Sequence, residues 1–278
     1  MLAPNNPTPN NSDLELAKFN SSFRSGWTKP KIKDRFVAAI IHFGLSLIVA
    51  FSITVPLVFW LYPSPYFEGA GGLNLLALIL GIDAVIGPVL TFLIFDRAKK
   101  SLRKDLWVIA LLQIAALVYG LYATAQSRPL FLTFVVDRYE MVSAADVDPE
   151  EFKRAPSTLK MPAWGKPELA YAEQPSDRKQ REEVLFASVS GLDLNRMFRY
   201  YKPAERSRSK ILERARPISE LSTFNNLDQV NRALVKFGSQ KFVYVPVQGK
   251  RRDLTALINA DTGELIEVVD LKPWSTAK

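Results

Sequence analysis

The chain has 278 residues, with 36 Lys and Arg against 28 Asp and Glu and a formal net charge of +8 at neutral pH. It contains no cysteine, which excludes disulfides, thiolate catalysis and Cys-ligated metals. The basic residues form no dense face interleaved with stacking aromatic side chains, so we expect no nucleic-acid partner.

Residues 1–30 are rich in Asn and Pro and poor in bulky apolar side chains, which predicts a disordered cytoplasmic tail. Three long apolar runs follow, at residues 36–62, 73–95 and 106–125, and Asp83 is the only formal charge in them. As helices they would be about 40, 34 and 30 Å long, against a hydrocarbon core of about 30 Å. A helix of a soluble bundle keeps a polar stripe toward the solvent, which these runs lack. We therefore predict a three-helix transmembrane anchor at residues 31–125.

The basic residues beside these runs predict the orientation in the membrane. The connector at 63–72 contains none, whereas two other segments are rich in them. They are Lys18, Arg24, Lys29, Lys31, Lys33 and Arg35 before the first run, and Arg97, Lys99, Lys100, Arg103 and Lys104 after the second. The positive-inside rule places both segments in the cytoplasm, where anionic headgroups would attract them, and residues 126–278 outside.

The outer segment predicts an α+β domain. We expect a strand over 131–142, a short helix capped by Asp146 or Asp148 with Pro149 in its first turn, and an irregular, proline-rich connection at 156–175. Helices are expected at 176–190 and 222–238, each ended by glycine. Alternating segments at 241–248, 253–260 and 264–271 predict a C-terminal antiparallel β-meander.

The outer segment offers no pattern for catalysis. The single histidine, His42, lies in the first apolar run, and the carboxylates of the outer segment show no recognisable pairing. The stretch NADTGE lacks the spacing of a calcium-binding loop and is typical of a β-turn. We therefore expect no enzymatic activity, no metal and no cofactor.

Asp83 lies near the middle of its run, where an uncompensated charge costs about 3 kcal/mol or more. It is therefore expected to be protonated, to face a polar group of another helix, or to await a partner protein. By helical rise, His42 and Gln113 lie at one depth, about 9 and 10 Å from the cytoplasmic end, and Asp83 at about 18 Å. Ser46, at about 15 Å, is the best match in depth, so a neutral Asp83 bonded to Ser46 competes evenly with a functional role.

Small residues and a proline surround this aspartate. Pro88 removes a backbone donor, which predicts a kink, and Gly81 and Gly87 permit close helix approach. Helix docking explains these features together. We therefore take Asp83, Gly81, Gly87, Pro88, His42 and Gln113 as candidate partner-binding residues.

Several segments between Lys31 and Val147 occur together in one known family. They are KIKDRFVAAIIHFGLSLIVA, LYPSPYFEGAGGLNLLALILGIDAVIGPVLTFLIFDRAKKSLRKDL, LLQIAALVYG and RPLFLTFVVDRYEMVSAADV. In this order they resemble the type IV pilin accessory proteins of the TfpX/TfpZ kind. The resemblance implies a Gram-negative inner-membrane protein that assists the assembly or surface display of a major pilin, without enzymatic activity.

This reading agrees with the predicted anchor and outer domain, which offer a pilin both a membrane helix face and an external surface. We hypothesise that Asp83 and its bend form a lateral docking site for a pilin helix. Two alternatives stay open: a membrane-anchored periplasmic sensor or regulator, and a membrane enzyme of pilin modification. For the enzyme, Asp96 and Asp105 are the nearest candidate carboxylates, although nearby Lys and Arg favour ordinary salt bridges.

Overall fold

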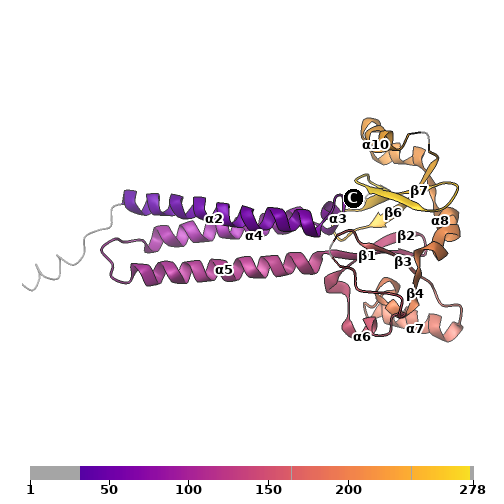
Figure 1. Ribbon diagram of the computed structural model, residues 1–278, viewed down its shortest axis with the longest axis horizontal. Coiled ribbons are helices and arrows are strands. Elements are labelled where there is room, and N and C mark those ends of the chain that lie inside the picture. The colour runs from indigo at the N-terminus through magenta and orange to yellow at the C-terminus, as the bar shows by residue number, and fades with distance from the viewer. Residues whose placement is uncertain (1–31, 164, 239, 276–278) are drawn as a thin grey trace, which may run out of the picture. The chain divides into compact units, whose positions relative to one another are not determined.

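A computed structural model describes residues 32–163, 165–238 and 240–275 (Figure 1). The predicted disordered tail at 1–30 lies outside these residues. The chain divides into two compact units, Met1–Ile48 with Ile82–Ala115, and Val49–Gly81 with Ala116–Lys278. Each of the three long helices contributes one part to either unit.

The three apolar runs form helices α2 (Ile32–Leu61), α4 (Gly72–Ile94) and α5 (Leu102–Ser127). All three are long and apolar enough to cross a membrane. Large apolar side chains point outward along them, including Phe59, which is 81% exposed, and Trp107, which is 74% exposed. Such outward apolar surface is expected of helices that face lipid. Helix α5 begins four residues before the predicted run, because the charged residues before the run are compatible with a helix. An acidic residue such as Asp105 is favourable in the first turn.

The first connector holds a short buried helix. Helix α3 (Tyr66–Ala70) follows a cis bond between Ser64 and Pro65. Tyr66 and Ala70 lie in the main hydrophobic core of the sheet domain. A side chain added at Gly69 would meet Met141 Cε at 2.9 Å, so glycine lets α3 lie close against the sheet. The connector is therefore part of the folded sheet domain, which is called the outer domain after its predicted location.

The outer domain is built on one eight-stranded sheet. Its strands are β1 (Pro129–Val135), β2 (Arg138–Ser143), β3 (Glu168–Ala172), β4 (Tyr201–Pro203), β5 (Arg216–Pro217), β6 (Phe242–Gln248), β7 (Leu254–Asn259) and β8 (Leu265–Val269). The order is β4-β3-β1-β2-β6-β7-β8, with β5 paired to β6.

The sheet is mixed, so the predicted C-terminal antiparallel meander is present but does not make up the whole sheet. Strands β6, β7 and β8 do form the antiparallel meander predicted at the C-terminus. However, β1 pairs parallel with β3, and β2 pairs parallel with β6. All seven residues of β1 are buried, as expected of a central strand covered on both faces. The meander is thus one part of a larger sheet.

Three other local predictions need correction. The expected strand over 131–142 is a hairpin that turns at Val136 and Asp137, and the connection at 156–175 contains β3. The expected helix over 222–238 is split into α9 (Leu221–Phe224) and α10 (Leu227–Leu234), because Asn226 caps α10 by accepting a hydrogen bond from the amide of Asp228.

Two other helices lie where the sequence predicts them, after Asp148 and within 176–190. Helix α6 (Pro149–Phe152) is capped by Asp148, and α7 (Arg178–Val189) is capped by Asp177. Helix α8 spans Arg208–Arg214. The 3-10 helices are Ala144–Asp146, Leu194–Arg196, Phe198–Tyr200, Ala204–Ser207, Ile218–Glu220 and Val235–Phe237.

Successive residues of a strand point to opposite faces of the sheet and therefore belong to different hydrophobic cores. In β1, Leu132 and Phe134 join the core that includes α3, whereas Phe131 packs in a second core with Phe198. In the meander, Tyr244 lies in a third core beside α10. The sheet is therefore covered on both faces, which holds it as one rigid platform.

Candidate functional site

A polar cluster joins α2, α4 and α5 within the unit formed by Met1–Ile48 and Ile82–Ala115. His42 Nδ1 lies 2.6 Å from Thr91 Oγ1, and His42 Nε2 lies 2.5 Å from Gln113 Oε1. The histidine of one helix thus bonds to both of the other helices. The equal depth predicted for His42 and Gln113 is confirmed.

The partners of His42 decide its tautomer. The amide oxygen of Gln113 can only accept, so Nε2 of His42 donates to it. Nδ1 of the neutral imidazole can then accept the hydroxyl proton of Thr91. The amide nitrogen of Gln113 donates to Ser46 Oγ at 3.4 Å and to the backbone carbonyl of Asp83 at 3.2 Å. The cluster is therefore a connected hydrogen-bond network.

Gly87 makes room for this network. A side chain added at Gly87 would overlap the amide group of Gln113 and meet His42 Nε2 at 3.0 Å. Glycine therefore lets the hydrogen-bonded pair lie against the backbone of α4. By contrast, no atom lies within 4 Å of a side chain added at Gly81. Gly81 thus borders open space, and the close approach expected of both glycines is seen only at Gly87.

Asp83 does not take the partner that depth alone favours. Its side chain is 6% exposed, and Oδ1 is buried without a hydrogen-bond partner among the described residues. Ser46 instead accepts from Gln113, and the contact of Gln113 with Asp83 is to the backbone carbonyl. A buried carboxyl oxygen without a partner costs free energy. Among the described residues of this cluster, Asp83 has a buried side-chain oxygen without a hydrogen-bond partner.

The remaining candidates lie on the same helix or beside it. Pro88 lies inside α4, next to Gly87, as predicted. The contact of Thr91 with His42 was not predicted from the sequence. Its position eight residues after Asp83 shows only that it is a polar residue of the same helix. Only the rotation of the helices about their axes brings Thr91 to His42.

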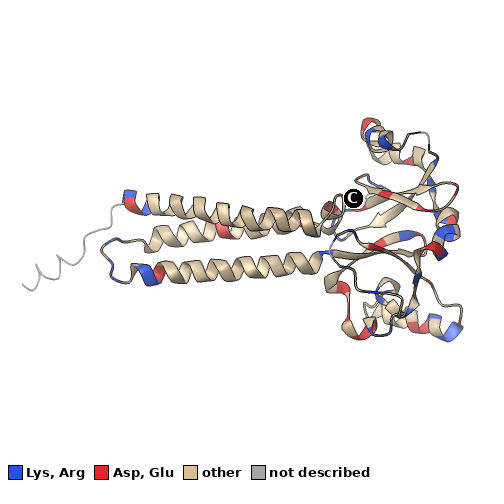
Figure 2. Cartoon of the chain, viewed as in Figure 1, with Lys and Arg blue, Asp and Glu red and all other residues tan. Residues whose placement is uncertain are grey.

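The connector between α4 and α5 carries surface ion pairs, and Figure 2 shows its basic residues near those at the start of α2. Lys99 Nζ lies 2.6 Å from Asp105 Oδ2, and Arg97 lies 3.6 Å from Asp34. Asp96 accepts the backbone amide of Ala98 at 2.9 Å. Asp96 and Asp105 thus have local structural partners, and no metal-binding group of three His, Asp or Glu residues occurs among the described residues.

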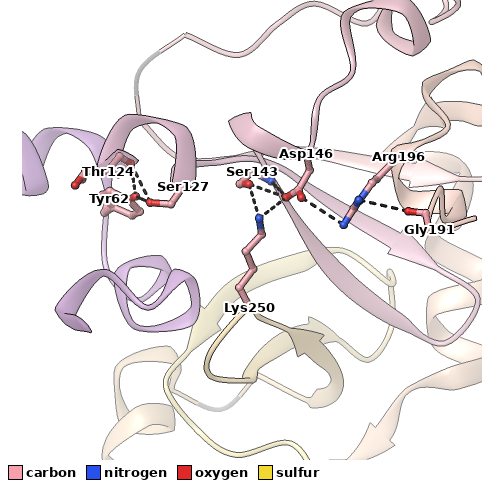
Figure 3. Close-up of polar contacts among 8 residues, drawn as sticks. All are labelled: Tyr62, Thr124, Ser127, Ser143, Asp146, Gly191, Arg196 and Lys250. Atoms are coloured by element: carbon pink, nitrogen blue, oxygen red, sulfur yellow. Dashed lines mark hydrogen bonds and ion pairs between the residues drawn. The ribbon is translucent and has the colours of Figure 1, made fainter. Parts of the chain in front are cut away.

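The unit formed by Val49–Gly81 and Ala116–Lys278 carries two further polar groups, drawn in Figure 3. Tyr62 Oη donates to the carbonyl of Thr124 at 2.6 Å and lies 2.5 Å from Ser127 Oγ, which ties the end of α2 to α5. Around Asp146, Oδ2 lies 2.6 Å from Ser143 Oγ and 2.8 Å from Lys250 Nζ. Both groups join distant parts of the chain and act structurally, so the cluster around Asp83 remains the candidate site.

Three helices long and apolar enough to cross a membrane, with an internal polar cluster and followed by a mixed-sheet domain, define a membrane-anchored class of protein. Comparison with known proteins is consistent with this class. Residues 30–71 match the family model described as fimbrial assembly protein FimB.

Two relatives extend the match to most of the chain. The chain is 31% identical over 217 residues to the fimbrial assembly protein of serogroup I from Dichelobacter nodosus, covering 75% of this chain and 83% of the relative. It is 30% identical, with the same coverage, to the serogroup E1 protein of that organism. The serogroups C1 and C2 protein is 36% identical over 130 residues, 44% of this chain and 98% of the relative. No solved structure matches the chain.

The chain therefore belongs to the family of fimbrial assembly proteins. Its role is in fimbrial assembly. The resemblance is thus confirmed at the level of fimbrial assembly, while the matched proteins do not support the narrower TfpX/TfpZ assignment.

Proposed function

We propose that the protein is a non-enzymatic inner-membrane accessory factor that assists the assembly or surface display of a type IV major pilin by contacting it in the membrane and outside it. Membership of the fimbrial assembly family supports the part of the proposal that concerns assembly. The basic residues near the start of α2 and between α4 and α5 support a cytoplasmic N-terminus and a periplasmic sheet domain.

The observation that carries the membrane contact is the unpartnered Oδ1 of Asp83. The neighbouring network of His42, Thr91, Gln113 and Ser46 is satisfied within the chain, so it needs no partner. A helix that docks beside α4 and displaces the side chains that cover Asp83 can supply the missing hydrogen bond, which is favourable in a medium without water.

The shape of α4 around Asp83 supports docking of a helix. Ile82, Val85 and Ile86 are 39%, 60% and 50% exposed, and Gly81 borders open space. An apolar face with one small residue lets a second helix approach closely. We propose this face of α4 as the pilin contact, with Asp83 buried beside it on the side of α4 that carries Gly87.

Site-specific photo-crosslinking tests the proposal. A photoreactive residue at Val85 is expected to capture the major pilin, whereas one at the equally exposed Val118 of α5 is the matched control. In the Val85 background, Asp83→Asn and Asp83→Ala should lower capture several-fold, while Asp105→Asn should not. Immunoblotting of the protein itself separates lost contact from lost folding. Unchanged capture, pilin level and twitching in both Asp83 variants would contradict the docking site.

The sensor and enzyme alternatives make different predictions. A sensor alters pilin transcript level without capture at Val85, and a modifying enzyme alters the mass of the pilin. Transcript measurement and intact-mass analysis of pilin from a deletion strain distinguish these outcomes.

A further inference from the structure

A polar hollow of about 800 Å³ lies in the unit that contains the sheet domain. One side is formed by β8 and the residues after it, another by α10, and Ser64 and Pro65 complete the lining. Strand β8 lies at the end of the sheet order, so the hollow borders a sheet edge. None of the residues that line the hollow belongs to the polar cluster around Asp83.

The charges that line the hollow do not cancel. Four cationic and two acidic side chains take part: Arg232, Lys236, Arg252 and Lys272, with Glu267 and Asp270. Lys236 Nζ lies 2.6 Å from Glu267, and Arg252 lies 3.0 Å from Asp270. These two ion pairs leave Arg232 and Lys272 without an anionic partner among the described residues, and both are exposed. The hollow therefore favours an anion.

The backbone beside one of these cations is held in place. Asn225 Nδ2 donates to the carbonyl of Lys272 at 2.9 Å, and its Oδ1 accepts the amide of Lys272 at 2.8 Å. The two bonds fasten the chain after β8 to the residue between α9 and α10. The site is thus built on a fixed backbone, and only the side-chain heads of Arg232 and Lys272 need to be ordered by a ligand.

The hollow lies at the level where the anchor leaves the membrane. Ser64 follows the last residue of α2 by three positions, a reach of at most about 10 Å. Exposed Trp60 and Tyr122, near the ends of α2 and α5, are typical of the membrane interface. Because the headgroup layer adds about 5–7 Å on each side of the hydrocarbon core, headgroup phosphates lie within reach of the hollow.

We propose that this hollow binds the phosphate headgroup of an anionic phospholipid from the leaflet at which α2 ends. The guanidinium of Arg232 suits a bidentate contact with phosphate oxygens, and Lys272 adds a second charge. A zwitterionic lipid carries its own cation and benefits less from the unpaired charges. The lipid would fasten the sheet domain to the membrane surface beside the anchor, independently of any contact with pilin.

Native mass spectrometry of the full chain in detergent, with added phosphatidylglycerol or phosphatidylethanolamine, tests the proposal. The wild type should retain phosphatidylglycerol preferentially. The double variant Arg232→Gln/Lys272→Gln should lose this preference, with affinity lowered by about tenfold, a loss of two charge-assisted contacts. The matched control Lys179→Gln/Arg181→Gln removes the same charge from exposed α7 residues and should behave as the wild type.

Three results would overturn the proposal. The first is equal retention of both lipids by the wild type, and the second is an unchanged preference in the Arg232/Lys272 variant. In the third, soluble glycerol phosphate displaces the lipid at equal concentration, which would define a free-phosphate site. If the Arg232/Lys272 variant keeps its lipid but no longer captures pilin from a photoreactive residue at Val85, the hollow contacts pilin. The lipid assignment would then be wrong. Thermal unfolding of each variant verifies that it is folded.

Discussion

Lys250 Nζ lies 2.8 Å from Asp146 Oδ2, so the turn between β6 and β7 is tied to the segment that follows β2 (Figure 3). The two residues are more than a hundred positions apart, and the pair supports the parallel junction of β2 with β6. Ser143 donates to the same carboxylate from its hydroxyl at 2.6 Å and from its amide at 2.9 Å. This relationship holds the two halves of the mixed sheet together at one edge of the junction.

Lys250→Met is expected to destabilise the outer domain by about 1 kcal/mol, a modest value because the lysine is partly exposed. Asp146→Asn should cost at least as much, since it weakens three hydrogen bonds. Thermal or denaturant unfolding of the full chain in detergent measures the change. Lys241→Met, at an exposed lysine outside this network, is the control. Equal stability of the two lysine variants would contradict the role of the pair.

The same network predicts a pH dependence. Burial by itself raises the pKa of Asp146, but the hydrogen bonds from Lys250 and Ser143 outweigh it and hold the pKa below its ordinary value. The carboxylate therefore stabilises the fold above its unfolded pKa of about 3.9, and this contribution is lost as pH falls through the lower folded pKa. Asp146→Asn should flatten this acid dependence in unfolding curves measured between neutral pH and about pH 3. An unchanged slope would count against the assignment.

Tyr62→Phe should destabilise the chain by about 1–2 kcal/mol, because it removes the buried hydroxyl that bonds Thr124 and Ser127. Tyr119→Phe is the matched control, since that tyrosine is 72% exposed on α5. Both variants are compared by thermal unfolding in one detergent. A loss of similar size in both would show that the Tyr62 hydroxyl has no special role.

Gly87→Ala should destabilise the helical anchor by about 1–3 kcal/mol, because the added methyl group overlaps the Gln113 amide and separates it from His42. Gly81→Ala meets open space and should be neutral or stabilising by up to about 1 kcal/mol, since alanine is the better helix former. Unfolding of the two variants in detergent tests the difference. The polar network is misassigned if both alanines behave alike.

Val136→Gly should stabilise the outer domain by about 0.5–1 kcal/mol. Val136 has a φ of 56°, a left-handed conformation that costs about 1–2 kcal/mol for a residue with a β-carbon. The greater backbone freedom of glycine in the unfolded chain offsets part of the gain. Val136→Ala keeps the β-carbon and should give no comparable gain. The denaturant midpoints of the two variants show whether a gain in stability comes from relief of backbone strain or from removal of the exposed valine side chain.

The depth argument for the anchor was right about one pair and wrong about another. Helical rise placed His42 and Gln113 at one level, and they bond. It also favoured Ser46 for Asp83, yet Ser46 pairs with Gln113. Rise along a helix depends only on residue number, whereas the direction of a side chain depends on how the helix is rotated against its neighbours.

The amino-acid sequence by itself determined the features that depend on local chemistry: three runs of membrane length, the cap Asp148 as one of two candidates, and the alternation of the final meander. The sequence did not predict the β1–β2 turn, because Val136 adopts a left-handed backbone conformation that is usually indicated by glycine. Tertiary structure alone decided the parallel pairings of β1 with β3 and β2 with β6, and the place of Tyr66 in the core. These contacts join segments distant in the chain, so they are selected by the apolar surface that the whole domain can bury.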